Sequence, residues 1–435
     1  MECMQLLESA GVAVCILHGY ATYPDCIPSD VDFVVSPRGL QKLPAVLKHG
    51  ENATGARLVQ VIQHEDTCYS YILAHPGANG DVAFLQLDAA TDYRRNGRIF
   101  FRAEEFLSSR KRFKDFWVPP PHLEFTYYLV KKIAKGYMDE RHCSYLSELY
   151  LQDPQRCKEQ ILRFWSSAAA QKLIRAAASN NWDEVGAALS QLRQDLLQTT
   201  VRKDPLGVAL YWWGELQRAV KRWYQPTGLH VVFLGPDGSG KSSVIAQVEK
   251  NLRLAFRRTA RRHLRPYLFK PQKGAWAPAT NPHAKPPYGR FKSVLKLAYL
   301  WFDYTVGYVF RIQPQLVRST LVLFDRYLDD LLVDPRRYRY GGPLWLARLV
   351  ARFIPRPDLV ILLDAPPGVL QRRKQEVSFE ETARQREAYL ELVQNLPNGY
   401  VVDASKPLDE VIAEVQRIIL NYMAERTARR LRLKG

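Results

Sequence analysis

The amino-acid sequence predicts an α/β protein: a C-terminal doubly wound parallel sheet, a helical middle and a small N-terminal α/β unit. From Leu229 to Tyr422, β-rich runs alternate with helical patterns, which favours a parallel sheet covered by helices. Between residues 122 and 223, Leu, Ala, Tyr and Trp recur every three or four residues, a helical spacing. Before residue 117, short β-rich runs dominate: VAVCIL, VDFVV, RLVQVIQ, YSYILA and VAFLQL.

Two clusters of turn-forming residues separate these parts. They are the three prolines at 119–121 and the Pro-Thr-Gly run at 226–228. We therefore expect domains over 1–117, 122–224 and 228–422, followed by a basic tail over 423–435. A tail of this composition is expected to be a frayed, solvated helix end rather than a docking site.

Composition indicates a soluble, cytoplasmic protein. The chain has 435 residues, of which 47% are hydrophobic and 24% charged. Its start carries Glu2 and Glu8 and no basic region typical of a secretory signal. The longest apolar stretch, Val294 to Phe310, is interrupted by Lys296 and Asp303. All six cysteines lie in the first 157 residues without a CxxC pair, so we expect reduced thiols rather than zinc ligands or disulfides.

The formal net charge of +18 calls for an anionic partner. Nothing in the sequence resembles a nucleic-acid-binding motif, and nothing specifically indicates contact with a membrane surface. The remaining candidate from charge alone is the phosphates of nucleotides. The sequence leaves the oligomeric state open, a dimer included.

A phosphate-binding loop is the strongest motif. The buried-strand run Leu229–Leu234 leads into GPDGSGKS at 235–242, and a helical run follows. Glycines allow backbone N–H groups to turn towards phosphate oxygens, and the helix N-terminus adds a favourable dipole. Lys241 would reach the β- and γ-phosphates of a nucleotide, and the Ser242 hydroxyl would bind Mg²⁺. The alternative is a glycine-rich turn without a ligand.

Later strands also deliver polar residues. Thr320–Phe324 ends in Asp325 and Arg326; the carboxylate would lie beside the loop and hold Mg²⁺ or the acceptor, and the guanidinium would grip an acceptor phosphate. The alternative for this Asp-Arg pair is a surface ion pair. The strand Asp358–Asp364 precedes a helix with Arg372, Arg373 and Lys374, and Tyr400–Ser405 forms a last strand and turn.

As an ordered set, these motifs resemble the thymidylate kinase family. GPDGSGKSS is similar to its phosphate loop, Asp325-Arg326 to its DR motif, RPDLVILLDAPP to its third strand, and VVDASKPLDEV to its adenine-side turn. The resemblance implies Mg²⁺-dependent ATP binding and phosphoryl transfer, with Asp237 contacting the acceptor sugar. Arg372 and Arg373 would lie in or beside a mobile lid, which should supply the transition-state cation because Ser239 leaves the loop without one. The implied catalytic residues are Lys241, Asp325, Arg326, Arg372 and Arg373, and the implied nucleotide-binding residues are Gly235, Asp237, Gly238, Ser239, Gly240, Lys241, Ser242, Ser243 and Ala404.

Two departures argue against dTMP as the acceptor. Ordinary thymidylate kinases are single domains of about half this length, and the segment between Arg265 and Leu321 holds the Pro-rich run 282–289 and an aromatic helix with Trp301, Asp303 and Tyr304. The Arg- and Tyr-rich run 329–342 is similar to thymidylate-kinase-like proteins found beside bacterial polysaccharide genes. This run would bind an anionic or sugar-containing acceptor; the alternative is a basic surface loop.

The N-terminal unit carries a second candidate site. A hydrophobic strand ends in His18-Gly19-Tyr20, and Asp30 and Asp32 follow on another strand, where alternate side chains share one face. Asp88 ends a later run, so three carboxylates form a predicted Mg²⁺ site. The pattern resembles the nucleotidyltransferase fold, although Tyr20 stands where that family has Ser or Gly. The alternative is that these aspartates are solvated strand-end residues.

Three functions therefore compete. The first is an ATP-dependent kinase of the thymidylate-kinase-like type, with the N-terminal unit binding or transferring a nucleotide. The second makes nucleotidyl transfer in the N-terminal unit the main chemistry. The third is an ATP-dependent binding module for nucleic acid or membrane, which predicts steep salt dependence and indifference to Lys241.

Overall fold

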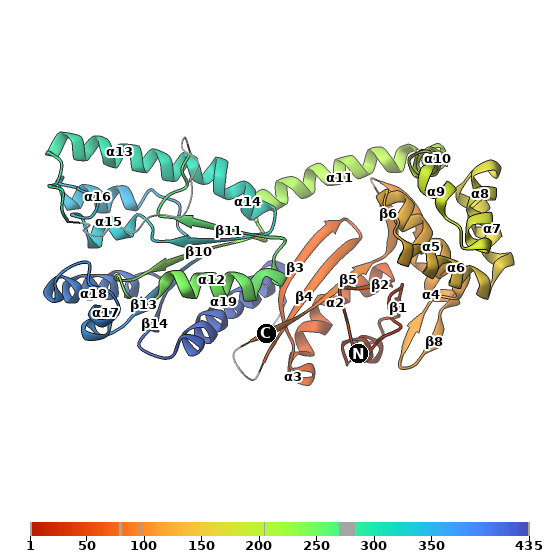
Figure 1. The fold of residues 1–435 in the computed structure, drawn as a ribbon, viewed down its shortest axis with the longest axis horizontal. Helices are drawn as coiled ribbons and strands as arrows, with labels where there is room; N and C mark the ends of the chain where they lie inside the picture. Colours follow the sequence, from red (N-terminus) through yellow and green to blue (C-terminus); the bar gives the residue numbers. More distant parts are fainter. Residues whose placement is uncertain (1, 78–80, 96, 204, 269–282, 434–435) are drawn as a thin grey trace. The chain divides into compact units, whose positions relative to one another are not determined.

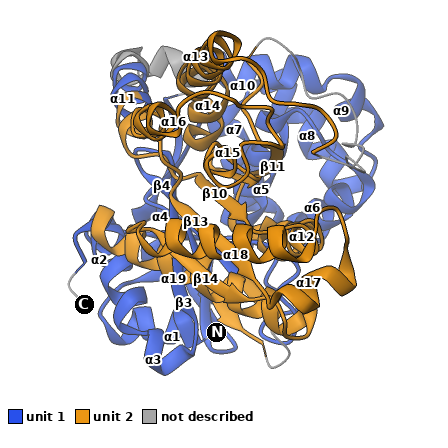
Figure 2. Ribbon diagram, turned by 90° about the vertical axis from the view of Figure 1, so that its left-hand side faces the viewer, with its two compact units in different colours: residues 1–73, 85–219, 431–435 blue, residues 74–84, 220–430 orange. Residues whose placement is uncertain are grey.

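The computed structural model describes residues 2–77, 81–95, 97–203, 205–268 and 283–433. Two compact units divide the chain. Unit 1 comprises residues 1–73, 85–219 and 431–435, and unit 2 comprises 74–84 and 220–430 (Figure 2). Most of the N-terminal α/β segment and of the helical middle, which we expected as two domains, thus falls within one unit, with residues 74–84 and 220–224 assigned to unit 2.

Unit 1 contains a five-stranded sheet in the order β1-β2-β5-β4-β3 (Figure 1). All five β-rich runs form strands: β1 (Val14–Ile16), β2 (Val31–Val35), β3 (Arg57–Glu65), β4 (Cys68–Pro76) and β5 (Val82–Ala90). β1 pairs antiparallel with β2, and β2 pairs parallel with β5. Elements that the sequence analysis did not predict accompany this sheet: α1 (Glu2–Ser9), α2 (Pro37–His49), α3 (Glu51–Thr54), β6 (Asp92–Arg95), β7 (Arg98–Arg102), α4 (Ala103–Ser109), β8 (Lys111–Phe113) and β9 (Phe116–Val118).

The middle segment is helical, as predicted. Its helices are α5 (Pro121–Lys135), α6 (Glu140–Gln152), α7 (Pro154–Phe164), α8 (Ser167–Ser179), α9 (Asp183–Ala187), α10 (Leu189–Lys203) and α11 (Pro205–Tyr224). One hydrophobic core contains Cys15 and Val34 from the sheet together with Leu129 and Ile133 from α5. The sheet therefore packs one side against these helices, while its other core cluster, with Phe33 and Leu87, packs with Leu7 of α1 and Leu43 of α2.

Unit 2 is built on a parallel sheet in the order β11-β12-β10-β13-β14. Its strands are β10 (Leu229–Leu234), β11 (Arg258–His263), β12 (Thr320–Asp325), β13 (Leu359–Asp364) and β14 (Gly399–Asp403). After β10 the chain moves towards one edge of the sheet, and after β12 it moves towards the other. The carboxyl ends of these adjacent strands therefore form a switch point, where ligands bind in open α/β sheets.

Helices cover this sheet (Figure 1). They are α12 (Lys241–Leu252), α13 (Arg290–Gly307), α14 (Gln313–Val317), α15 (Asp329–Val333), α16 (Leu344–Ala351), α17 (Pro367–Arg373), α18 (Phe379–Gln394) and α19 (Leu408–Leu431), with a 3₁₀ turn (Arg253–Ala255) after α12 and a π-helical turn (Tyr308–Ile312) after α13. Residues 269–282, part of the segment expected to shape the acceptor pocket, lie outside the described residues.

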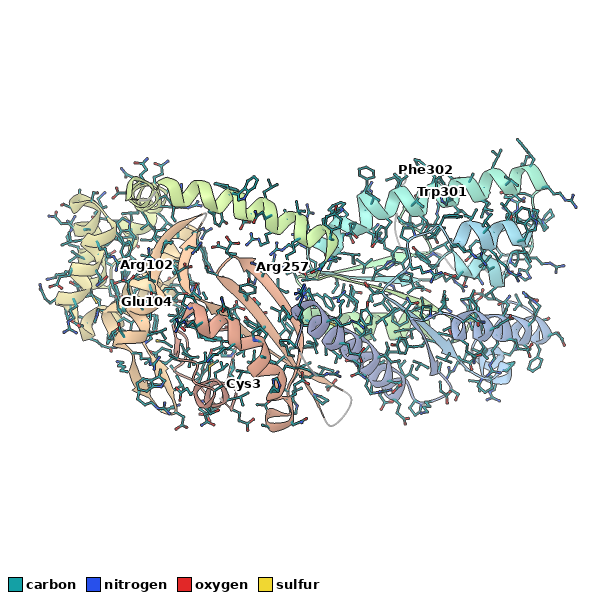
Figure 3. All side chains as sticks on the ribbon, turned by 180° about the vertical axis from the view of Figure 1, so that it is seen from behind. Cys3, Arg102, Glu104, Arg257, Trp301 and Phe302 are labelled. Carbon is teal, nitrogen blue, oxygen red and sulfur yellow. The ribbon has the colours of Figure 1, made fainter. Side chains whose placement is uncertain are left out.

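The long apolar stretch of the sequence lies mainly on α13. Leu297, Leu300 and Tyr304 pack in the core of unit 2, whereas Trp301 and Phe302 are exposed on the helix surface (Figure 3). Among the described residues, no helix has the length and apolarity needed to cross a membrane.

The C-terminal segment differs from the expected frayed tail. α19 continues to Leu431, and Arg426 is held by the backbone. Its Nη1 donates to the Gly228 carbonyl at 2.8 Å and its Nη2 to the Thr227 carbonyl at 3.2 Å. The basic residues here are thus part of a packed helix, because the apolar positions Ile419 and Met423 bury the other face. All six cysteines are free thiols, as expected.

Candidate active site

The phosphate-binding loop follows β10 and ends where α12 begins, as predicted. Gly235 and Gly238 have positive φ angles of 145° and 84°. A Cβ atom on Gly235 would lie 2.7 Å from the Leu363 carbonyl oxygen, and one on Gly238 would lie 2.7 Å from that of Leu370. Only glycine satisfies both the backbone angle and the close approach at these positions. The loop therefore keeps its backbone open to a ligand.

Lys241, the first residue of α12, is buried inside this loop. Its Nζ donates to the Gly235 carbonyl at 2.7 Å and to the Pro236 carbonyl at 2.8 Å, and it also contacts the Ser239 hydroxyl at 3.3 Å. Burial, reinforced by the positive charge of Arg326, lowers the pKa of Lys241 to about 8. The ammonium is thus positioned within the loop by backbone oxygens, where it can exchange them for phosphate oxygens.

Ser242 and Asp325 meet at the carboxyl ends of β10 and β12. The Ser242 hydroxyl donates to Asp325 Oδ2 at 3.2 Å, and Arg261 Nη2 lies 3.8 Å from the same oxygen. A hydroxyl and a carboxylate are hard oxygen ligands of the kind that Mg²⁺ selects. These two side chains, which the sequence predicts as metal ligands, therefore fit a shared Mg²⁺ site beside the loop.

Asp237, on the loop, is gripped by two arginines. Arg326 Nη2 donates to Asp237 Oδ1 at 2.6 Å, and Arg337 Nη1 donates to Oδ2. Burial would raise the pKa of Asp237, but the charges of Arg326 and Lys241 outweigh it and hold that pKa well below its usual range. The carboxylate is thus a poor base with both oxygens engaged.

Arg326 is the centre of a buried charge network rather than a surface ion pair. Its side chain is only 7% exposed, and its Nη1 donates to Asp330 Oδ2 at 2.7 Å. Asp330 is fully buried and also accepts hydrogen bonds from the hydroxyls of Tyr338 and Tyr389. With φ at 72°, Arg326 adopts a left-handed conformation that a non-glycine residue rarely takes. Such strain persists only where surrounding contacts over-determine it, as here, and is typical of functional sites.

The predicted lid arginines, Arg372 and Arg373, are the last two residues of α17. Arg372 is exposed, and Arg373 Nη1 donates to the Ala404 carbonyl at 2.8 Å, linking α17 to the turn after β14. After α17, Glu376 pairs with Lys374 and accepts from Arg337 Nη2 at 3.2 Å. The segment after α17 is therefore tied through Arg337 to Asp237 of the loop.

In unit 1, the structure brings the three predicted carboxylates together. Asp32 on β2 and Asp88 on β5 are register partners in adjacent parallel strands. The carboxylates of Asp30, Asp32 and Asp88 offer oxygen atoms within 4.8 Å of one another, which suits a divalent cation. Burial raises the pKa of Asp88 to about 6. The three predicted acids thus lie together at one place in the sheet.

Asp32 also contacts two nitrogen atoms that do not belong to the carboxylate cluster, one from Lys131 and one from His18. Lys131 Nζ on α5 donates to Asp32 Oδ2 at 2.7 Å, and His18 Nε2 lies 3.0 Å from the same oxygen. Burial would raise the pKa of Asp32, but its hydrogen bond to His18 and the charge of Lys131 hold that pKa well below its usual range. Asp32 therefore stays ionised with an internal counter-ion.

Tyr20 occupies the position where the resemblance calls for Ser or Gly. Its hydroxyl donates to Glu124 Oε2, and the Tyr145 hydroxyl donates to Glu124 Oε1. Glu124 is 1% exposed, and burial raises its pKa. The Tyr20 side chain is thus committed to a contact with α5, so its hydroxyl serves the packing of α5 against the sheet.

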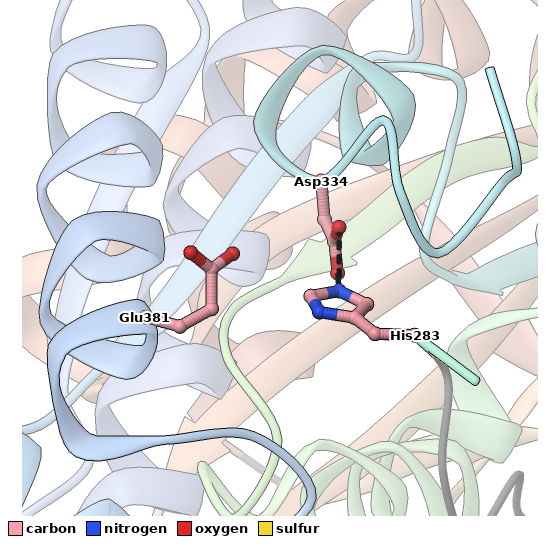
Figure 4. Close-up of side chains that lie close together, drawn as sticks. All are labelled: His283, Asp334 and Glu381. Atoms are coloured by element: carbon pink, nitrogen blue, oxygen red, sulfur yellow. Dashed lines mark hydrogen bonds and ion pairs between the residues drawn. The ribbon is translucent and has the colours of Figure 1, made fainter. Parts of the chain in front are cut away.

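A third cluster, His283, Asp334 and Glu381, also has the residue types of a metal site (Figure 4). His283 Nε2 lies 2.9 Å from Asp334 Oδ1. Gln385 Nε2 donates to Asp334 at 3.1 Å and to Glu381 at 2.9 Å, while Arg384 binds both oxygens of Glu381. Hydrogen bonds and ion pairs within the protein account for this cluster, and we assign no metal to it.

Several residues of both sites escaped the sequence analysis. Asp330, Arg337 and Tyr338 belong to a run whose density of Arg and Tyr pointed to an acceptor, but nothing singled them out individually. Tyr389 and Lys131 carried no sequence signal, because each reaches its carboxylate from a distant helix. Spacing along the chain does not reveal such contacts.

Comparisons with known proteins point to one enzyme class. No protein-family model matches the chain. The chain is 29% identical over 212 residues to the thymidylate kinase of Xanthomonas euvesicatoria pv. vesicatoria (strain 85-10), a match covering 46% of this chain and 88% of the relative. The thymidylate kinase of Xylella fastidiosa (strain M12) is 29% identical over 213 residues, covering 46% of this chain and 91% of the relative.

One solved structure that the chain matches is the crystal structure of thymidylate kinase from Ehrlichia chaffeensis. The identity is 18%, the match covers 44% of this chain and 99% of that chain, and the TM-score is 0.31. The sequence similarity to thymidylate kinases supports a P-loop kinase, an enzyme that transfers a phosphoryl group.

Proposed function

We propose that unit 2 is an ATP-dependent kinase that transfers the γ-phosphoryl group to a small phosphomonoester, with a role in nucleotide or polysaccharide metabolism. The observation that supports a phosphorylated acceptor is the pair of ion pairs that Arg326 and Arg337 form with Asp237. These guanidinium groups are suited to bidentate binding of a phosphate, and a carboxylate is the anion that occupies them without one. An acceptor phosphate would compete with Asp237 for the more accessible partner, Arg337.

The low basicity of Asp237 bears on the chemistry of the acceptor. A hydroxyl acceptor needs a group that removes its proton, and Asp237, ion-paired and with a lowered pKa, is a poor one. A phosphate oxygen is already anionic and needs no base. The low basicity of Asp237 therefore favours a phosphomonoester over an unphosphorylated sugar.

Phosphoryl transfer itself demands positioning and charge rather than covalent chemistry by the protein. The bond between the γ-phosphorus and the bridging oxygen of ADP breaks while a bond to the acceptor oxygen forms. Lys241 and the N-terminus of α12 would stabilise the negative charge on the β- and γ-phosphates. Arg372 and Arg373 on α17 would add positive charge when the lid that contains them closes over the phosphates. Mg²⁺, held by Ser242 and Asp325, would neutralise the phosphate oxygens when bound.

The test is a phosphoryl-transfer screen with γ-labelled ATP and Mg²⁺. Nucleoside monophosphates, sugar phosphates and unphosphorylated sugars would be offered to the full chain, with the Lys241→Ala variant as the blank. We expect label on a phosphomonoester acceptor. Label only on an unphosphorylated sugar would overturn the acceptor class, and no transfer to any acceptor would overturn the kinase.

Arg337→Ala should raise the KM for the acceptor found in this screen about 10- to 100-fold, because one charge-assisted hydrogen-bonding partner is lost. The KM for ATP should change little. Arg336→Ala is the matched control, since Arg336 is the exposed neighbour in sequence. Equal effects of the two substitutions would show that Arg337 does not bind the acceptor.

A second candidate function belongs to unit 1. The convergence of Asp30, Asp32 and Asp88 supports a metal–nucleotide site, and the resemblance to nucleotidyltransferases suggests transfer of a nucleotidyl group. These carboxylates would hold Mg²⁺, which would neutralise a nucleoside triphosphate when bound. Tyr20 stands where that family has Ser or Gly, and its hydroxyl is engaged by Glu124, so we propose no acceptor for this unit.

The Asp30→Asn/Asp32→Asn double variant should abolish any nucleotidyl transfer and leave kinase activity unchanged, because the kinase residues lie on unit 2. The measurement is transfer of label from α-labelled and γ-labelled nucleotide in parallel reactions. Equal loss of both activities would show that the two units are not chemically independent.

A further inference from the structure

We propose that Lys131 makes the carboxylate cluster of unit 1 bind a metal ion and a polyphosphate together rather than a metal ion alone. When a metal ion binds, the Lys131 ammonium would exchange Asp32 for the phosphates of the polyphosphate that binds with the metal ion. This inference rests on the proposed metal–nucleotide role of Asp30, Asp32 and Asp88.

The first argument is the place of the ammonium. Lys131 Nζ lies 2.7 Å from Asp32 Oδ2, an oxygen that His18 Nε2 also contacts at 3.0 Å. Asp32 is at the same time a member of the cluster. One carboxylate is therefore shared between an internal cation and the expected metal ion.

The second argument is electrostatic. The side chains of Lys131 and Asp32 are 12% and 22% exposed, so solvent screens their charges only partly. A divalent cation and an ammonium on the same carboxylate repel each other. A metal ion bound without phosphates would therefore weaken the ion pair between Lys131 and Asp32, and this cost lowers the affinity for free metal ions.

The third argument concerns where the ammonium goes. Lysine carries three donors on a flexible stem and binds phosphate as a point charge. Lys135 lies one turn further along α5, on the same side of the helix, and interacts electrostatically with Lys131, Asp32 and Asp30. A polyphosphate bound to the metal would thus meet two lysines from one helix. The phosphates would replace Asp32 as the anionic partner of Lys131 and so offset the cost of weakening that ion pair. The metal ion and the polyphosphate would therefore bind cooperatively.

The experiment measures this coupling directly. Mn²⁺ binding to the full chain would be followed by the electron paramagnetic resonance signal of free Mn²⁺, with and without inorganic tripolyphosphate, a probe that needs no base recognition. All proteins would carry Lys241→Ala to weaken phosphate binding by unit 2. The Asp30→Asn/Asp32→Asn substitutions identify the Mn²⁺ bound at the unit 1 cluster.

We expect Lys131→Met to tighten binding of Mn²⁺ alone about 10-fold and to weaken binding of tripolyphosphate in the presence of Mn²⁺ about 10-fold. Lys132→Met is the matched control, because the Lys132 ammonium contacts His142 Nε2 and interacts with Asp32 only through longer-range electrostatics. It removes the same charge from the same helix, so it should shift both affinities much less than Lys131→Met does.

The outcomes separate the inference from the function on which it rests. Suppose that Mn²⁺ binding depends on Asp30 and Asp32, and that tripolyphosphate changes the Mn²⁺ affinity equally in Lys131→Met and in the parent protein. This result would overturn the role of Lys131 and leave the metal–nucleotide site standing. Mn²⁺ binding that does not depend on Asp30 and Asp32 overturns the metal–nucleotide site itself. Opposite shifts of the two affinities in Lys131→Met, absent in Lys132→Met, support the proposal.

Discussion

Lys241→Ala should reduce the kcat for phosphoryl transfer by about 10³-fold, to the limit of detection, while the protein stays folded. The reason is that Lys241 supplies the positive charge inside the loop, where burial keeps water from replacing it. The alanine variant keeps the glycine conformations that shape the loop, because those depend on the Gly235 and Gly238 backbone. The measurement is single-turnover transfer from γ-labelled ATP to the acceptor identified by the screen.

The matched control is Lys250→Ala, which removes an exposed lysine from the same helix. It should leave the rate within a factor of about two, since an exposed charge is strongly screened. Undiminished transfer by a folded Lys241→Ala protein would contradict the role assigned to Lys241.

Asp330→Leu should destabilise unit 2 by about 3–5 kcal/mol. Asp330 is fully buried and binds Arg326, Tyr338 and Tyr389, so its removal leaves a buried guanidinium with one anionic partner fewer and two hydroxyls without an acceptor. The measurement is urea unfolding of the full chain. Because Mg-ATP stabilises the unit that binds it, the transition that shifts with Mg-ATP is the one to compare.

Two further variants locate the cause of this loss. Tyr389→Phe removes one hydrogen bond and should cost about 1 kcal/mol. Adding Arg326→Met to Asp330→Leu should recover part of the lost stability, since the buried guanidinium that has lost one of its two anionic partners is then removed as well. Strictly additive effects of Arg326→Met and Asp330→Leu would show that the two side chains do not stabilise each other.

The sequence-based predictions and the structure agree best for functional residues that are consecutive in the chain or lie at the ends of neighbouring strands. The phosphate loop was predictable because its glycines, its lysine and the flanking strand and helix are consecutive in the chain. The Ser242–Asp325 contact was predictable too, since parallel strands bring their carboxyl ends to one edge of the sheet. In unit 1, Asp30 and Asp32 were expected to share one face because alternate side chains of a strand do, and Asp88 was expected as a third acid from a later run.

The partners of these residues were not predictable in the same way. Arg326 was expected to present its fork to an acceptor, yet it is held between Asp237 and Asp330. Lys131 was one of several lysines on a helix, and only the packing of α5 on the sheet brings it to Asp32. Pairings of this kind depend on which helix faces cover which strand ends, information that local spacing does not contain.

The sequence by itself determined the β-rich runs, the helical middle, the phosphate loop and the acids at strand ends, because each follows from periodicity or from consecutive residues. Only the tertiary structure decided that the N-terminal sheet and the middle helices form one unit, since they share a core that includes Val34 and Leu129. It alone decided that Arg326, Arg337 and Lys131 are counter-ions of particular carboxylates. The physical reason is that a partly buried charge must find an opposite charge nearby, and folding, not the order of residues, sets which one it finds.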